Sequence, residues 1–259
     1  MMNKKYDELA KIIKQEQVTK EIYSMWIHCE SIANSAKPGQ FISVYTNDSG
    51  KLLPRPISIC EIDTKDKNLR IVYRVTGDDT GTKQFSKLGA GERIHILGPL
   101  GNGFLLTPNK KAILIGGGIG IPPMLELAKH LDGEKQIVLG YRDETFLAAE
   151  YEQYGKVYIA TEDGSNGSKG TVLDAIKQNQ LIADVIYACG PTPMLRVIKD
   201  YAKEQNILCY LSLEERMACG IGACLACVCK SVEQDEQTNV HNKRICKEGP
   251  VFLATEVEL

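Results

Sequence analysis

The chain has 259 residues, of which 43% are hydrophobic and 25% charged, and this composition is typical of a globular protein with a sizeable core. Its formal net charge of -2 does not indicate a basic surface of the kind that binds nucleic acid or an anionic membrane. No run of about 18 apolar residues is present, which excludes an ordinary membrane-spanning helix. We therefore expect neither nucleic acid nor a membrane as a partner.

Residues 15–103 are predicted to form short β-strands separated by turns. The runs that suggest strands are rich in β-branched and aromatic residues, and clusters of glycine, proline, asparagine and aspartate divide them. A short helix is expected near 82–88. Strands at this spacing predict a small barrel or sandwich, and the expected strands include 41–45, 56–60 and 69–75.

From residue 110 onward, apolar strand-like runs alternate with helical patterns. Such alternation predicts a parallel sheet with helices on both faces. The expected strands are 112–115, 136–140, 157–160, 185–188 and 207–211, and the expected helices include 172–178 and 194–204. We therefore divide the chain into a β-barrel (1–104), an α/β nucleotide-binding domain (105–213) and a cysteine-rich module (214–259).

Cysteines crowd the C-terminal module. The spacing Cys219-x4-Cys224-x2-Cys227, followed by a distant Cys246, is the ligand pattern of a plant-type [2Fe–2S] cluster. Cys229 could compete as a ligand, but the spacing favours Cys246. A structural zinc site is the alternative, although zinc sites usually have two short cysteine pairs separated by a longer span.

The remaining four cysteines, Cys29, Cys60, Cys189 and Cys209, are scattered along the chain as single thiols rather than as a disulfide framework. The N-terminal residues mix charges of both signs, so we expect no signal peptide. A reducing cytoplasm is the compartment that these features favour.

Two glycine-rich turns follow predicted strands. The first contains Gly116, Gly117, Gly118 and Gly120, and the second contains Cys189, Gly190 and Pro191. Glycines allow a backbone to approach a diphosphate closely. The first turn departs from the strict G-x-G-x-x-G pattern, and a purely structural turn is the alternative for it. Two such turns at the carboxyl edge of one sheet frame the crevice where α/β folds bind nucleotides.

The barrel segment contains Arg55-Pro56-Ile57-Ser58. Its arginine could bind a phosphate with two hydrogen bonds and its serine could bond a ring nitrogen, but solvated arginines on strands are common.

Taken together, these motifs resemble the ferredoxin-reductase superfamily and, within it, the electron-transfer subunits of class 1B, NAD-dependent dihydroorotate dehydrogenases. The segments that carry the resemblance are 212–229, 246–252, 97–104 and the two glycine turns. The resemblance implies that FAD is bound by Arg55, Pro56, Ile57, Ser58, Val72, Tyr73, Arg74, Gly81 and Thr82. Ile57 departs from the aromatic residue that many members have at this position.

The resemblance also implies a function in pyrimidine biosynthesis. Electrons would pass from the FMN of a separate catalytic subunit through the [2Fe–2S] cluster and FAD to NAD, in a heterotetramer with two subunits of each kind. The chain shows no obvious dihydroorotate site. Two alternatives are an NAD(P)H–ferredoxin oxidoreductase subunit of the same superfamily and, from another class, a zinc-stabilised nucleotide-binding regulator.

The choice between NAD and NADP depends on residues after the strand at 136–140. Asp143 or Glu144 would accept a hydrogen bond from a free ribose 2′-hydroxyl and repel a 2′-phosphate, whereas Arg142 would attract that phosphate. We expect NAD to be preferred.

Overall fold

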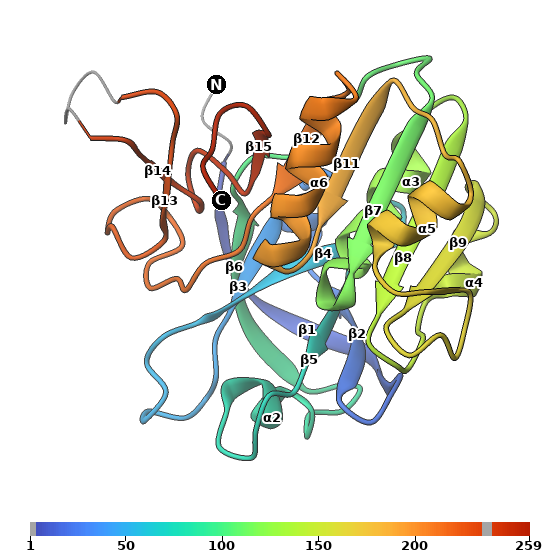
Figure 1. Ribbon diagram of the computed structural model, residues 1–259. Coiled ribbons are helices and arrows are strands. Elements are labelled where there is room, and N and C mark those ends of the chain that lie inside the picture. Colours follow the sequence, from blue (N-terminus) through green and yellow to red (C-terminus); the bar gives the residue numbers. More distant parts are fainter. Residues whose placement is uncertain (1–3, 235–239) are drawn as a thin grey trace.

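The computed structural model describes residues 4–234 and 240–259. Its first half is a closed barrel with the strand order β1-β2-β5-β4-β3-β6, in which neighbouring strands run antiparallel (Figure 1). Alternate side chains fill the interior with isoleucines and a few aromatic residues, so the barrel has a core of its own. The strands are β1 (Tyr6–Gln17), β2 (Ile22–His28), β3 (Phe41–Val44), β4 (Arg55–Asp63), β5 (Asn68–Arg74) and β6 (Arg93–Leu100).

Two short helices lie in the barrel connections, α1 (Glu30–Ala33) and α2 (Gly81–Phe85). The hydroxyl of Thr80 caps α2 by accepting a hydrogen bond from the backbone N–H of Lys83. Phe85 at the end of α2 is buried and packs edge-on against Tyr73, which fixes the helix against the barrel core.

The second half is a seven-stranded sheet with the order β10-β9-β8-β7-β11-β12-β15. All neighbouring pairs are parallel except β12 with β15. Its strands are β7 (Ala112–Gly117), β8 (Lys135–Tyr141), β9 (Lys156–Thr161), β10 (Ser168–Lys169), β11 (Val185–Cys189), β12 (Leu208–Ser212) and β15 (Val251–Leu253).

Helices cover both faces of this sheet, because its central strands are apolar on both sides. Ile113 and Ile115 face the cluster that contains α5 (Val172–Gln178) and α6 (Thr192–Glu204). Ala112 and Leu114 face α3 (Pro122–His130) and α4 (Ala148–Tyr151). The 3-10 turn η1 (Gly118–Gly120) leads from β7 into α3, which begins with two prolines in its first turn.

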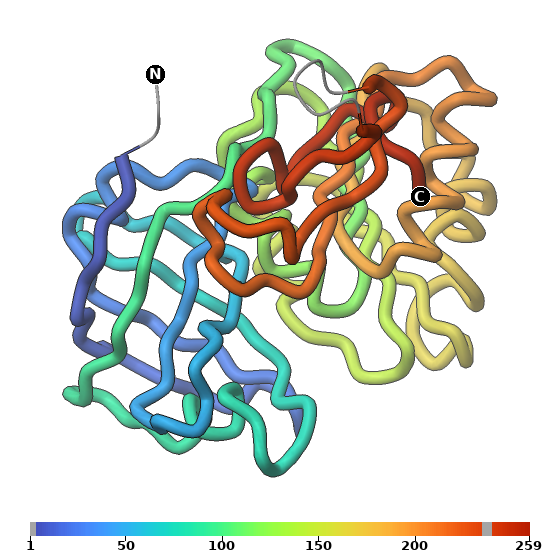
Figure 2. Tube along the Cα trace, turned by 90° about the vertical axis from the view of Figure 1, so that its left-hand side faces the viewer, coloured from blue at the N-terminus to red at the C-terminus, as the bar shows by residue number. Residues whose placement is uncertain are grey.

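The cysteine-rich segment lies across the junction between the barrel and the sheet (Figure 2). It contains a small antiparallel pair, β13 (Val228–Lys230) with β14 (Asn242–Arg244), and then supplies β15 to the edge of the large sheet. The side-chain amide of Asn102, just after β6, donates to the carbonyl oxygens of Glu248 and Val251 at 2.9 Å each. The segment is therefore fixed to both larger units.

The observed architecture confirms the expected fold class, a barrel followed by a parallel α/β sheet and a cysteine-rich C-terminal segment. The expected strands and helices lie where predicted to within a few residues. The exception is β1, which starts at Tyr6, whereas strands were expected only from residue 15. No helix among residues 4–234 and 240–259 is long and apolar enough to cross a membrane.

Candidate functional site

A cavity of about 520 Å³ opens where the barrel, the sheet and the C-terminal segment meet. The barrel contributes Pro56 and Ser58 from the start of β4 and Arg74 from the end of β5. The sheet contributes both glycine-rich turns. The cavity therefore brings together residues from the candidate flavin motif and from the candidate nucleotide turns, which lie more than forty positions apart in the chain.

Successive side chains of β4 point to opposite faces of the strand, and this determines which motif residues line the cavity. Pro56 and Ser58 line it, whereas the side chain of Ile57 between them is buried in the barrel core. On β5, Val72 and Tyr73 are also buried, and only Arg74 faces the cavity. The Tyr73 hydroxyl donates to the side-chain carbonyl of Gln15 at 2.7 Å, so this tyrosine is held inside the barrel.

Arg55 lies away from this cavity wall, against the start of α2. A Cβ added to Gly81 would lie 3.1 Å from the guanidinium carbon of Arg55, so the arginine rests directly on this glycine. Thr82 follows, with its hydroxyl 3.1 Å from that of Thr80. The structure thus joins Arg55 with Gly81 and Thr82, which are distant in sequence, at one end of the barrel.

The two glycine-rich turns touch each other. In the parallel register of β7, β11 and β12, Gly116 is opposite Cys189, which is opposite Ser212, so these strands end side by side. A Cβ added to Gly120 would lie 2.5 Å from the carbonyl carbon of Cys189 and 2.6 Å from the backbone nitrogen of Gly190. Glycine is required at Gly120 for the turns to pack at this distance.

A second, more polar cavity of about 310 Å³ continues beyond the first, and Arg74 and Gly118 line both. Its other walls are the β1–β2 turn and the loop after β8, which contains Arg142, Asp143 and Glu144. The backbone N–H of Glu144 is the main cause that holds the pKa of Asp143 below its ordinary value. The three residues expected to select between NAD and NADP therefore line this cavity, and Asp143 is ionised at neutral pH.

Several cavity residues were not expected from the sequence. They are Phe41 on β3, the segment Ser212–Met217 that leads from β12 to the cysteines, and Pro250 before β15. Residues 212–217 and Pro250 lie in two segments that carry the resemblance, 212–229 and 246–252, but neither was assigned to a cofactor site, because only the fold brings them to this cavity. A second signal was positional, since residues 212–217 directly follow a strand that ends at the nucleotide edge of the sheet.

The four expected cluster ligands lie in the C-terminal segment as two pairs of thiols. The Sγ atoms of Cys219 and Cys224 are 3.3 Å apart, and the backbone N–H of Cys246 points to the Sγ of Cys227 at 3.5 Å. Among the residues that the structure describes, no three His, Cys, Asp or Glu side chains already converge as metal ligands. Two pairs of thiols nevertheless fit the requirement of a [2Fe–2S] cluster, in which each iron takes two thiolates.

Backbone N–H groups approach the sulfurs. Burial acts to raise the pKa of the Cys219 thiol, but hydrogen bonds from the backbone N–H groups of Cys224 and Ile221 lower it below its ordinary value. Such bonds favour the thiolate form, which is the metal ligand. The Cys229 thiol lies on β13 and donates to the carbonyl of Lys243 at 3.5 Å. Burial raises the pKa of both Cys229 and Cys246, so the contact with Lys243, and not the pKa, distinguishes Cys229 from the expected ligand.

Comparison with known proteins adds independent evidence. A family model described as the iron-sulfur cluster binding domain of dihydroorotate dehydrogenase B matches residues 214–258. The chain is 43% identical over 256 residues to the "Dihydroorotate dehydrogenase B (NAD(+)), electron transfer subunit" of Fusobacterium nucleatum, covering 94% of this chain and 95% of the relative. It is 46% identical over 258 residues to the protein of the same name from Listeria monocytogenes, covering 96% and 98%.

Solved structures with the same fold include an NADH-dependent reduced ferredoxin-NADP oxidoreductase studied for flavin-based electron bifurcation. That likeness has a TM-score of 0.86 at 29% identity and covers 97% of this chain and 90% of the other. A cytochrome P450 reductase from Amycolatopsis is similar in fold, with a TM-score of 0.63 at 21% identity over 80% of this chain and 68% of the other.

Proposed function

Since the chain belongs to the family of electron transfer subunits of dihydroorotate dehydrogenase B (NAD(+)), we propose that it relays electrons between a dihydroorotate-oxidising partner subunit and NAD. The observation that carries this proposal is the meeting of three motifs at one junction. The flavin motif and the nucleotide turns share a cavity, and the segment that leads to the cysteines forms part of its wall.

The cofactors of this family are FAD and a [2Fe–2S] cluster, with NAD as the electron acceptor. We propose that Cys219, Cys224, Cys227 and Cys246 hold the cluster and that the two glycine-rich turns hold NAD. A flavin exchanges hydride with NAD and single electrons with an iron–sulfur cluster, so it supplies the link between two-electron and one-electron chemistry.

For FAD, we propose that the motif residues have different roles. Pro56, Ser58 and Arg74 line the shared cavity and would contact the ring system, with the Ser58 hydroxyl as a hydrogen-bond group. Arg55, together with Gly81 and Thr82 at the start of α2, would bind the diphosphate. Ile57 and Tyr73 would act by fixing their strands in the barrel core, and Val72 by packing β5 against the sheet domain.

The partner is a catalytic subunit that oxidises dihydroorotate, and we propose that it carries FMN and assembles with this chain as a heterotetramer with two subunits of each kind. Ile221 and Leu225 support docking at the cysteine loop, because both are apolar and exposed beside the proposed ligands. Such residues beside a redox centre would let a partner approach closely while excluding water.

The likeness to a ferredoxin-NADP oxidoreductase supports a second candidate, in which the electron partner is a ferredoxin. The identity of 29% in that comparison is well below the 46% shared with the Listeria subunit, and this difference favours the dihydroorotate assignment.

Analysis of the purified chain tests the proposal. We expect bound FAD, two irons and two sulfides per chain, and reduction of the flavin by NADH but not by dihydroorotate. A colourless protein that holds zinc would contradict the proposal and would favour a regulator without turnover. Dihydroorotate oxidation by the isolated chain would contradict the proposal that only the partner subunit oxidises dihydroorotate.

A further inference from the structure

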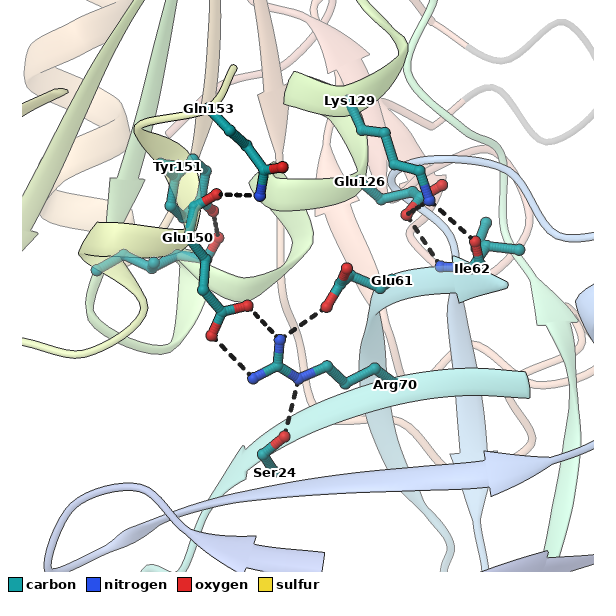
Figure 3. A network of polar contacts seen from close by, with 10 residues as sticks. Ser24, Glu61, Ile62, Arg70, Glu126, Lys129, Glu150, Tyr151 and Gln153 are labelled. Carbon is teal, nitrogen blue, oxygen red and sulfur yellow. Dashed lines mark hydrogen bonds and ion pairs between the residues drawn. The ribbon is translucent and has the colours of Figure 1, made fainter. Parts of the chain in front are cut away.

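Two groups of polar contacts cross the interface between the barrel and the sheet domain (Figure 3). In the first, Arg70 on β5 binds Glu150 on α4, with Nη2 donating to Oε1 at 3.1 Å and Nη1 to Oε2 at 2.5 Å. In the second, the carboxylate of Glu126 on α3 accepts the backbone N–H of Ile62 on β4 at 2.9 Å. Each contact joins one barrel strand to one helix of the sheet domain.

Arg70 is buried in the barrel and is held there from three sides. Its Nε donates to the hydroxyl of Ser24 at 2.8 Å, and its Nη1 donates to Glu61 at 2.7 Å, while the carboxylate of Glu150 reaches it from the other domain. The guanidinium is thus fixed by the barrel and offers its outer edge to Glu150. A bidentate arginine–carboxylate pair fixes orientation as well as distance.

Glu126 is fully buried, with a side chain that is 0% exposed. One carboxylate oxygen, Oε2, accepts the Ile62 N–H, whereas Oε1 has no hydrogen bond. His130 lies 3.2 Å from Oε1, but the hydrogen-bonding partner of its Nδ1 is the backbone carbonyl of Glu126 at 2.9 Å. Lys129 on the same helix donates to the carbonyl of Ile62 at 3.2 Å. The backbone N–H and the carbonyl oxygen of Ile62, near the end of β4, are therefore both hydrogen-bonded by side chains of α3.

The elements that these contacts join are the walls of the two cavities. β4 begins with the Arg55–Ser58 motif, and β5 ends at Arg74, which lines both cavities. α3 begins directly after the first glycine-rich turn, and α4 directly follows the loop of Arg142–Glu144. Each contact thus joins a strand that carries residues of the flavin motif to a helix that follows a nucleotide-site loop. Only a few residues of strand or helix separate each contact from the cavity wall.

Apolar side chains of the barrel and of the sheet domain also pack together at this interface. Cys60 and Val72 from the barrel pack in one cluster with Met124, Leu125 and other residues of the sheet domain. Apolar burial is non-directional, so it resists separation of the domains but permits small sliding movements. Hydrogen bonds to charged groups are directional and fix the relative position.

We propose that Arg70–Glu150 and Glu126–Ile62 are positioning contacts that set the distance between flavin and nicotinamide for hydride transfer. This inference rests on the proposed function, because it requires FAD on the barrel and NAD on the glycine turns. Neither contact touches either cofactor site directly. Their effect is on the rate of hydride transfer, which is sensitive to displacements of about 1 Å.

The primary variant is Glu150→Ala in the full chain. Arg70 keeps Glu61 and Ser24 as partners, so no buried charge is left unpaired and the protein folds. Glu150→Gln retains an acceptor for Arg70, and Glu152→Ala removes an exposed carboxylate next to the same helix as the matched control. Glu126→Ala and Glu126→Gln test the second contact in the same way, since only the glutamine can still accept the Ile62 N–H.

Stopped-flow reduction of bound FAD by NADH gives the rate constant of hydride transfer and the apparent Kd for NADH separately. We expect Glu150→Ala to lower the rate constant about tenfold, with FAD content and Kd unchanged, Glu150→Gln to lie between it and the parent, and Glu152→Ala to match the parent. A rate constant within twofold of the parent, or a loss confined to Kd, would overturn the inference.

Hydrogen exchange of the protein without NADH provides a readout that does not depend on turnover. We expect Glu150→Ala to lose protection in α4 and at the end of β5, whereas Glu152→Ala keeps it. Unchanged protection in Glu150→Ala would overturn the inference. If the parent chain binds no FAD, or if NADH does not reduce it, the proposed function itself fails, and this result is distinct from the failure of the positioning contacts.

Discussion

Replacement of Gly120 by alanine is the sharpest probe of the nucleotide site. Gly120 lies at the point where the first glycine turn touches the second, and its φ is outside the left-handed region. An alanine therefore adds no backbone strain, and the only change is one methyl group. That methyl would lie 2.5 Å from the carbonyl carbon of Cys189 and 2.6 Å from the nitrogen of Gly190.

The size of the effect follows from these distances. Ordinary contacts between carbon atoms are about 3.5–4.0 Å, so the two turns must separate by roughly 1 Å. Both neighbours are backbone atoms and cannot rotate away. Overpacking of this kind costs about 1–3 kcal/mol of stability, and a displacement of about 1 Å in a reacting site lowers a rate by about 100-fold.

The assay compares Gly120→Ala with Gly89→Ala. Gly89 is also outside the left-handed region, and its added Cβ would meet nothing closer than a carboxylate oxygen of Glu92 at 3.6 Å. We expect Gly120→Ala to lose about 100-fold in kcat/KM for NADH-dependent dye reduction while it retains bound FAD, and Gly89→Ala to match the parent. An unchanged kcat/KM in Gly120→Ala would refute the placement of NAD on these turns.

Two further predictions concern the cluster and the buried carboxyl. Cys229→Ser should retain the iron and its visible spectrum, whereas Cys246→Ser should lose both; the reverse result in iron analysis would contradict the ligand assignment. Burial raises the pKa of Glu126 above its ordinary value of 4.5, although the hydrogen bond from the Ile62 N–H and the nearby charge of Lys129 act to lower it. The folded state therefore holds this proton more tightly, so the free energy of unfolding should fall as pH rises from 4.5 through the raised pKa, and Glu126→Gln should flatten this dependence in urea titrations. A parent and variant with parallel pH profiles would exclude Glu126 as the source.

Much of the fold and site could be predicted from the sequence because the relevant signals are local. The strand runs of the sheet are apolar on both faces, and the helix 172–178 was predicted with its observed bounds. Its start is marked by a capping box between Thr171 and Asp174. The cysteine spacing and the glycine turns are likewise short patterns whose chemistry is carried by neighbouring residues.

What could not be predicted depends on contacts between distant segments. Strand β1 was recognised only in part, because only Ala10 and Ile12 of its twelve residues are buried and charged residues dominate the rest. The cavity wall at 212–217 and the contact between Arg70 and Glu150 arise only when the barrel and the sheet pack together. A lone arginine on a strand gives no signal in the sequence that a carboxylate eighty residues away will meet it.

The most direct test of the central claim is reconstitution of this chain with the FMN-containing catalytic subunit of a dihydroorotate dehydrogenase B. We expect the mixture to reduce NAD in the presence of dihydroorotate, although neither subunit does so alone. Cys224→Ser should abolish this transfer while NADH still reduces the bound FAD of the variant. Dihydroorotate-dependent NAD reduction that survives in the Cys224→Ser complex would contradict the claim that electrons pass through this chain's cysteine-bound cluster.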